Sequence, residues 1–169
     1  MSGALSQPVV LDTTVLSNFA STGTVDRLVD IIERPVTVPA VRTELEEGAM
    51  QEYEFLDAAL AHLGDGIAVL GTEALSNIET AEIRERLDRG EAESLLGGIE
   101  REGTLATDDR AARTVAAEQG VPATGSVGLL VLGIQCGVVD ADTANRWLDD
   151  WRAKRGYYAP VERIEDILE

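Results

Sequence analysis

The sequence predicts a three-layer α/β/α sandwich built on a central parallel sheet. Short runs of β-branched and aliphatic residues alternate with longer segments of helical periodicity, which is the pattern of parallel α/β folds. The first run, at 8–12, is apolar up to its last residue, an aspartate. A chain of 169 residues favours one domain. We therefore expect a single domain over 1–169, with C-terminal helices at about 141–169 that pack on it or on a partner.

Hydrophobic periodicity assigns the elements in chain order. Strands are expected at 8–12, 36–38, 67–70, 104–107 and 121–124. Helices are expected at 13–20, 24–33, about 39–63, 73–88, about 91–102, 110–119, about 125–135, 141–153 and 160–169.

In the first half of the chain, capping residues, prolines and glycines mark the ends of these elements. The strand at 8–12 passes through a turn into the first helix. Thr24 fits the N-cap of the second helix. Pro35 ends that helix, because proline disfavours helical backbone in the residue before it. Pro39 opens the third helix, and the Gly-Asp-Gly sequence at 64–66 forms the turn after it.

In the second half, glycines separate the elements. The charged helix at 73–88 is broken by Asp-Arg-Gly at 88–90, and Gly103 and Gly120 end two later helices. The helix at 141–153 carries two tryptophans, four residues apart and hence on one face. Such a pair belongs more often to a core or an interface than to a surface that stacks on nucleic-acid bases.

Acidic residues dominate the charge of the chain. There are 31 Asp and Glu against 14 Lys and Arg, the net charge is −17, and Lys154 is the only lysine. Because the carboxylates are spread along the whole sequence, we interpret them as a halophilic surface adapted to high salt. At low ionic strength such a protein repels nucleic acid and anionic membranes. At molar salt the Debye length falls to roughly 3 Å, and a polyanionic substrate is no longer excluded.

Several classes of protein are disfavoured. No apolar run approaches the roughly 20 residues of a membrane span, and the N-terminus has no basic, apolar leader, so we expect a cytoplasmic protein without membrane contact. Cys136 and His62 are the only residues of their types. They exclude an internal disulfide and a zinc site of four Cys/His ligands. Any metal must be held by oxygen ligands.

Acidic residues recur where such ligands are needed. They close two strands or lie early in the helices that follow strands or turns: Asp12, Glu44, Glu91, Glu93, Asp108 and Asp109. In a parallel sheet the carboxyl ends of the strands share one edge with the N-termini of the following helices. Converging carboxylates repel one another unless a cation lies between them. Oxygen ligands without Cys or His select Mg²⁺ or Mn²⁺.

Most of these acids also have a structural interpretation. Asp108 or Asp109 can cap the next helix. Glu93 can be an acid of a first helical turn, which the helix dipole favours. Glu44 can belong to a charged helix face. The interpretation as a surface group is weakest for Asp12, because the strand before it is so apolar.

Six short motifs resemble those of PIN-domain ribonucleases, particularly VapC-type toxins of the Gly-Glu-Ala-Glu variant. They keep the order of that family and cover almost the whole chain, at 9–19, 38–45, 90–95, 106–113, 124–130 and 156–158. The resemblance implies metal-dependent hydrolysis of phosphodiester bonds in single-stranded RNA. It also implies a toxin inhibited by an antitoxin protein, and a homodimer.

The resemblance also implies the site residues. The catalytic residues are expected to be Asp12, Glu44, Glu93 and Asp109, of which Asp12, Glu93 and Asp109 bind the metal. Glu93 is preferred to Glu91 because it stands at N3 if Gly90 is the N-cap. Asp109 is preferred to Asp108 because it follows Thr107 by two residues.

Other residues can support these. The hydroxyls of Thr13, Thr14 and Ser17 can bond a metal-bound water or a phosphate, or else cap a helix. Arg110 and Arg113 can contact the RNA backbone, or else pair with nearby acids on the surface.

Two other functions compete with the nuclease. One is a catalytically silent PIN-like binding or scaffold protein, which the near-complete set of acids disfavours. The other is a phosphatase or phosphoacceptor with Asp12 as nucleophile. A haloacid-dehalogenase site would have a second aspartate at position 14, which is threonine.

Overall fold

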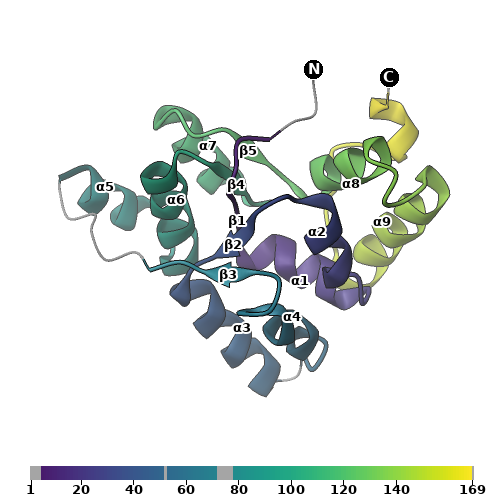
Figure 1. Ribbon diagram of the computed structural model, residues 1–169, viewed down its shortest axis with the longest axis horizontal. Coiled ribbons are helices and arrows are strands. Elements are labelled where there is room, and N and C mark those ends of the chain that lie inside the picture. The colour runs from purple at the N-terminus through teal and green to yellow at the C-terminus, as the bar shows by residue number, and fades with distance from the viewer. Residues whose placement is uncertain (1–4, 52, 72–77, 169) are drawn as a thin grey trace.

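A computed structural model describes residues 5–51, 53–71 and 78–168, and within them it places an all-parallel five-stranded sheet at the centre (Figure 1). The strands are β1 (Val9–Leu11), β2 (Pro35–Thr37), β3 (Ala68–Val69), β4 (Thr104–Ala106) and β5 (Ala123–Thr124). Their order across the sheet is β3-β2-β1-β4-β5. The predicted parallel α/β fold is confirmed.

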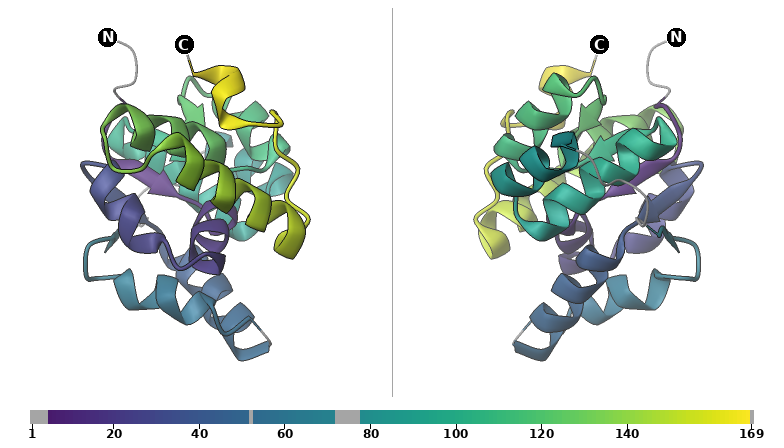
Figure 2. Two further views of the ribbon diagram at one scale, coloured as in Figure 1. Left: turned by 90° about the vertical axis from the view of Figure 1, so that its right-hand side faces the viewer. Right: turned by 90° about the vertical axis from the view of Figure 1, so that its left-hand side faces the viewer.

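Helices cover both faces of this sheet (Figure 1). Their bounds are α1 (Thr13–Ser21), α2 (Val25–Ile31), α3 (Pro39–Gln51), α4 (Leu56–His62), α5 (Ile78–Arg86), α6 (Arg89–Arg101), α7 (Arg110–Glu118), α8 (Ser126–Gln135) and α9 (Ala141–Arg155). The two views of Figure 2 show α8 and α9 in front on one side and α5 to α7 in front on the other. Helices α3 and α4 extend the molecule beyond the β3 edge (Figure 1).

Two apolar clusters fill the space between the three layers. The larger cluster joins the sheet to α1, α2, α8 and α9, and its largest buried side chain is Trp151. The Trp151 ring lies edge-to-face on Phe19, with ring centroids 5.0 Å apart. The second cluster joins the sheet to α5, α6 and α7 through residues such as Leu95 and Leu105. Trp151 is therefore a core residue, as its helical spacing indicated.

The topology has one point where the strand order reverses. From β1 the chain proceeds outward through β2 and β3, then crosses to β4 and β5 on the other side of β1. In open α/β sheets, ligands bind beyond the carboxyl ends of the strands at this switch point. Here it lies between β1 and β4, whose ends are joined by a 3.0 Å hydrogen bond from the Asp12 N–H to the Ala106 carbonyl.

The helix expected at about 39–63 is wrong, because the chain forms two helices there, α3 and α4. The chain reverses between them, and the Leu56 side chain packs close to Gly48 of α3. The reversal buries Leu56 and Ala59. A straight helix of that length would carry both side chains away from the core.

Two other helix predictions need correction. The helix expected from about 91 begins at Arg89, with Asp88 rather than Gly90 as its N-cap. The helix expected at 160–169 is only a short 3₁₀ helix, Ile164–Ile167. Side chains of α9 bind the backbone of this segment instead, since Asn145 Oδ1 accepts the Ile164 N–H at 2.9 Å. Of the helix expected at 73–88, residues 73–77 lie outside the described residues.

Within the described residues, no helix is both long and apolar enough to cross a membrane.

Candidate active site

Asp12 lies at the switch point of the sheet. Its side chain is 1 % exposed, and Oδ2 accepts a hydrogen bond from the Thr107 hydroxyl. Burial raises the pKa of Asp12 to about 7, and the carboxylates of Glu44 and Asp88 raise it further against the opposing effect of the Thr107 hydrogen bond. Keeping this carboxylate ionised costs free energy in the folded protein, and a bound cation would remove that cost.

Glu44 bridges three helices beside Asp12. Its Oε1 accepts from the Thr13 hydroxyl of α1, and its Oε2 accepts from the Gly90 N–H of α6 at 3.1 Å. A Cβ atom at Gly90 would lie 2.5 Å from both carboxylate oxygens. The glycine of the third motif is therefore needed for the close approach of Glu44 to the α6 backbone.

The two glutamates of the third motif take different positions. Asp88 and Glu91 form a capping box, in which the Glu91 N–H donates to Asp88 Oδ1 at 2.9 Å and Glu91 Oε1 accepts from the Asp88 N–H at 3.4 Å. Burial raises the pKa of Glu91 to about 7, with further contributions from Asp88, Asp109 and Asp12. Glu91 therefore shares the electrostatic environment of Asp12 and Asp109.

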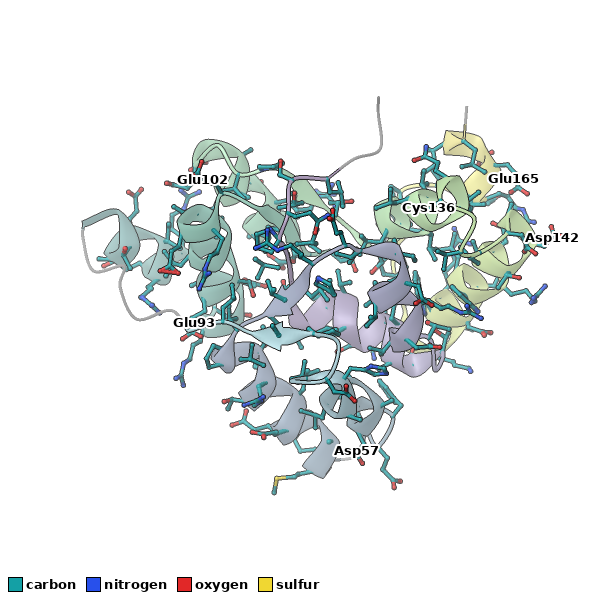
Figure 3. All side chains as sticks on the ribbon, viewed as in Figure 1. Asp57, Glu93, Glu102, Cys136, Asp142 and Glu165 are labelled. Carbon is teal, nitrogen blue, oxygen red and sulfur yellow. The ribbon has the colours of Figure 1, made fainter. Side chains whose placement is uncertain are left out.

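Glu93 instead lies against the start of α3. It is buried, and its Oε1 accepts from the Ala40 N–H at 3.0 Å. Its Oε2 lies 4.0 Å from Nε of the exposed Arg89. Figure 3 shows it at the end of α6 that adjoins α3. The expectation that Glu93 occupies N3 is wrong, because the helix begins earlier and Glu91 is the N3 residue. Two residues apart on a helix, the glutamates differ by about 200° in direction.

Asp109 is fixed beside Asp12 through Thr107. Asp109 Oδ2 caps α7 by accepting the Ala112 N–H at 2.9 Å. The Asp109 N–H donates at 3.1 Å to the Thr107 hydroxyl oxygen, whose proton is donated to Asp12. The spacing of two residues between Thr107 and the acid thus has a geometric function. Asp109 therefore caps α7 and also lies beside Asp12.

Asp108 faces away from this group and holds other segments together. Its oxygens accept from the Ser126 N–H at 2.8 Å and hydroxyl at 2.5 Å, from Asn18 Nδ2 at 3.1 Å, and from the Tyr157 hydroxyl at 3.3 Å. Its N–H donates to the Thr14 hydroxyl at 3.0 Å. These bonds give Asp108 a structural role, and Thr14 belongs to the same network.

The chain matches a known family over nearly its whole length. A family model described as a PIN domain matches residues 8–169. The chain belongs to the PIN-domain family. A PIN domain generally indicates nuclease activity, with a nucleic acid as substrate. The comparison with curated proteins gives no match.

PIN nucleases typically use divalent metal ions, and the donor set of this PIN domain fits such an ion. Asp12, Glu91 and Asp109 offer only carboxylate oxygens, which Mg²⁺ and Mn²⁺ prefer. The pKa values of Asp12 and Glu91 are raised mainly by burial and further by neighbouring carboxylates, and a bound cation would offset both effects. Within the described residues, no three Asp, Glu, His or Cys side chains are already grouped as a metal site. Side-chain movement would therefore accompany metal binding.

The two predicted arginines line a pocket next to the site of this PIN domain. Arg110 and Arg113 are exposed on α7, and with Asp108 and Tyr157 they border a cavity of about 460 Å³. A Cβ atom at Gly125 would lie 2.7 Å from both Arg113 Nη1 and Asp108 Oδ1. Arg113 is thus near the structural aspartate, whereas Arg110 faces solvent.

Sequence reasoning missed three polar residues of this PIN domain. Asp88 acts electrostatically on Asp12 and Glu91, and the Asp-x-x-Glu spacing of a capping box could have identified it. Asn18 and Tyr157 bind Asp108. They lie in motifs that were recognised, but no local pattern gives their contacts.

Proposed function

We propose that this PIN domain is a Mg²⁺- or Mn²⁺-dependent endoribonuclease that hydrolyses phosphodiester bonds of single-stranded RNA. The observation that carries the proposal is Asp12, a carboxylate buried at the switch point of the sheet with other acids beside it and a pKa raised to about 7. A solvated surface acid would not be buried in this way, and the Asp12 side chain makes no capping hydrogen bond at the start of α1.

The acidic residues of the site have different roles in this proposal. We assign the metal ligands to Asp12, Glu91 and Asp109, so that Glu91 replaces Glu93 as the ligand from α6. Glu44 orders the start of α6 through its hydrogen bond to Gly90. A divalent ion bound there would supply neutralisation of the scissile phosphate and activation of the attacking water.

Thr107 is a positioning residue in this proposal. Its hydroxyl accepts from the Asp109 backbone and donates to Asp12, so it fixes the orientation of the Asp12 carboxyl group. Thr13 orients Glu44 in the same way. Ser17 is buried and lines a pocket together with Thr13 and Glu44.

We further propose that the protein is the toxin of a toxin–antitoxin pair, acting in the cytoplasm as a homodimer. The order of the six motifs supports this role. The sequence pattern of VapC-type toxins includes the Gly-Glu-Ala-Glu motif, which here supplies Gly90 and Glu91.

RNA cleavage by the wild type and by Asp12→Asn, in molar salt with Mg²⁺ or Mn²⁺, tests the enzymatic proposal. We expect the wild type to cleave single-stranded RNA and the variant to lose at least about a hundredfold of the rate. Equal rates would indicate a contaminating nuclease and overturn the proposal. A covalent phosphate on Asp12 would instead establish the phosphatase alternative.

A further inference from the structure

A second pocket, of about 430 Å³, adjoins the carboxylate site at Glu44. Thr13 and Ser17 of α1 form one wall, Tyr53 and Phe55 from the turn between α3 and α4 form another, and Arg155 at the end of α9 closes it. We call it the aromatic pocket. Its volume falls in the range of small-molecule sites, about 300–1,000 Å³, and is sufficient for one nucleotide.

The aromatic pocket is continuous with the proposed catalytic group. Glu44 belongs to its lining and is hydrogen-bonded to Thr13, which also lines it. Whatever occupies the pocket therefore lies next to the group formed by Asp12 and its neighbours.

Arg155 is held in place at the wall of this pocket. Its Nε donates to Asn18 Oδ1 at 2.9 Å, and its guanidinium carbon lies 5.6 Å from the centre of the Phe55 ring. Asn18 is itself held by Asp108 and Ser126. The network around Asp108 thus orients a cation toward the pocket.

Among the described residues, the two cations of the pocket, Lys154 and Arg155, form no ion pair with an acid, although the chain carries 31 acids. No carboxylate that the structure describes lies within ion-pair distance of Lys154 or Arg155. Cations in a last helical turn are favoured by the helix dipole, and this alone would explain a solvated pair. It does not explain why Arg155 contacts Asn18 and Phe55.

Tyr53 supplies an aromatic ring that is half exposed. Its side chain is 52 % exposed and lies edge-to-face on Phe55, with ring centroids 5.9 Å apart. An exposed ring beside cations is the combination with which proteins bind single-stranded nucleic acids, by stacking on bases and by contacts to phosphates.

We propose that the aromatic pocket binds one nucleotide of the RNA strand, adjacent to the phosphate that is cleaved. Tyr53 stacks on the base, and Arg155 and Lys154 contact the phosphate. This inference rests on the proposed ribonuclease function. Charge complementarity favours a phosphate here, because these two cations are the part of the lining without an acidic partner among the described residues.

The test measures binding separately from cleavage. The full-length Asp12→Asn protein, without added metal, is titrated into fluorescein-labelled oligouridine and oligoadenosine in high salt, and anisotropy is recorded. We expect Tyr53→Ala and Arg155→Gln in this background to weaken binding by about tenfold each. Arg146→Gln removes the same charge from the same helix, at an exposed side chain that contacts Thr143. This control should change the affinity by less than about twofold.

A second measurement reports stacking itself. Oligonucleotides that carry 2-aminopurine should lose fluorescence on binding, and Tyr53→Ala should abolish that loss. Thermal unfolding checks each variant. If Arg155→Gln does not fold, Lys154→Gln takes its place, because Lys154 is exposed and no described carboxylate pairs with it.

The two proposals fail in different ways. If the pocket variants bind RNA as tightly as their parent, the nucleotide pocket is overturned, whether or not the wild type cleaves RNA. If RNA binding depends on Tyr53 and Arg155 but the wild type cleaves nothing, the pocket stands and the ribonuclease function falls. If Arg155→Gln abolishes binding of polyglutamate and leaves RNA binding unchanged, the pocket receives an acidic protein segment and our proposal is wrong.

Discussion

Single residues at the carboxyl end of β1 determine what this PIN domain can do. Burial raises the pKa of Asp12, and neighbouring acids raise it further. Neither an arginine nor a lysine is among the causes of this shift. The carboxylate that we propose as a metal ligand is therefore destabilising while no ion is bound.

The metal-free protein should gain stability from Asp12→Asn, and more so at high pH. The pKa of Asp12 is about 7 in the folded protein against an ordinary value of 3.8. Between these values the folded state binds more protons than the unfolded state, so the free energy of unfolding falls as the pH rises. The advantage of the Asp12→Asn variant over the wild type should grow by about 2 kcal/mol between about pH 5 and pH 8. Urea unfolding in a chelator measures it, and a constant difference would contradict the assignment.

Gly90→Ala should impair the site without unfolding the protein. The added Cβ would lie 2.5 Å from the Glu44 carboxylate oxygens, so Glu44 must leave the Gly90 N–H. The helix itself gains from alanine by up to about 1 kcal/mol. We expect at least about tenfold slower RNA cleavage with little change in melting temperature. Gly97→Ala on the same helix, where the nearest atom is 3.4 Å away, is the control.

At the scale of elements, the sequence predicts the helices and strands that are determined by local patterns of residues. The strands of the described sheet and the order of helices could be read from apolar runs, prolines and glycines, because these act within a few residues. The break between α3 and α4 could not, because it depends on the burial of Leu56 and Ala59 that follows once the chain has folded back on α3. The start of α6 sets the position of both glutamates, and a shift of two residues at that boundary assigned N3 to Glu93, whereas the structure places Glu91 there.

Alanine substitutions at these two glutamates separate a ligand from a structural acid. Glu91→Ala should lower Mn²⁺ affinity by at least about tenfold. Glu93→Ala should leave that affinity nearly unchanged and lower the free energy of unfolding by about 1 kcal/mol, because it removes the acceptor of the Ala40 N–H at the start of α3. Calorimetric titration and urea unfolding give the two quantities. The reverse pattern would restore Glu93 as the metal ligand.

At the scale of the whole molecule, the dominant property is the negative net charge. The charges sum to −17, and the excess carboxylates repel one another in the folded state. The ion pairs among the described residues all include at least one exposed partner and offset little of it. The network from Asp108 through Asn18 to Arg155 shows how this acidic surface still presents an arginine beside the proposed site.

The melting temperature should therefore rise steeply with salt. Added KCl screens the repulsion among the carboxylates, and most of the gain should occur as the Debye length falls from about 10 Å to about 3 Å. Scanning calorimetry from about 0.1 M to above 1 M KCl measures it. Choline chloride is the control for a specific potassium effect. A melting temperature that falls with salt would contradict the interpretation as a halophilic surface.

The central claim is that the acids around Asp12 close on a divalent ion. Calorimetric titration of Mn²⁺ into wild type and Asp12→Asn, in molar KCl at neutral pH, tests it most directly. We predict one saturable binding process in the wild type, accompanied by proton release because Asp12 and Glu91 have pKa values of about 7, and its loss in the variant. No binding to the wild type at millimolar Mn²⁺, or equal binding to both proteins, would contradict the claim.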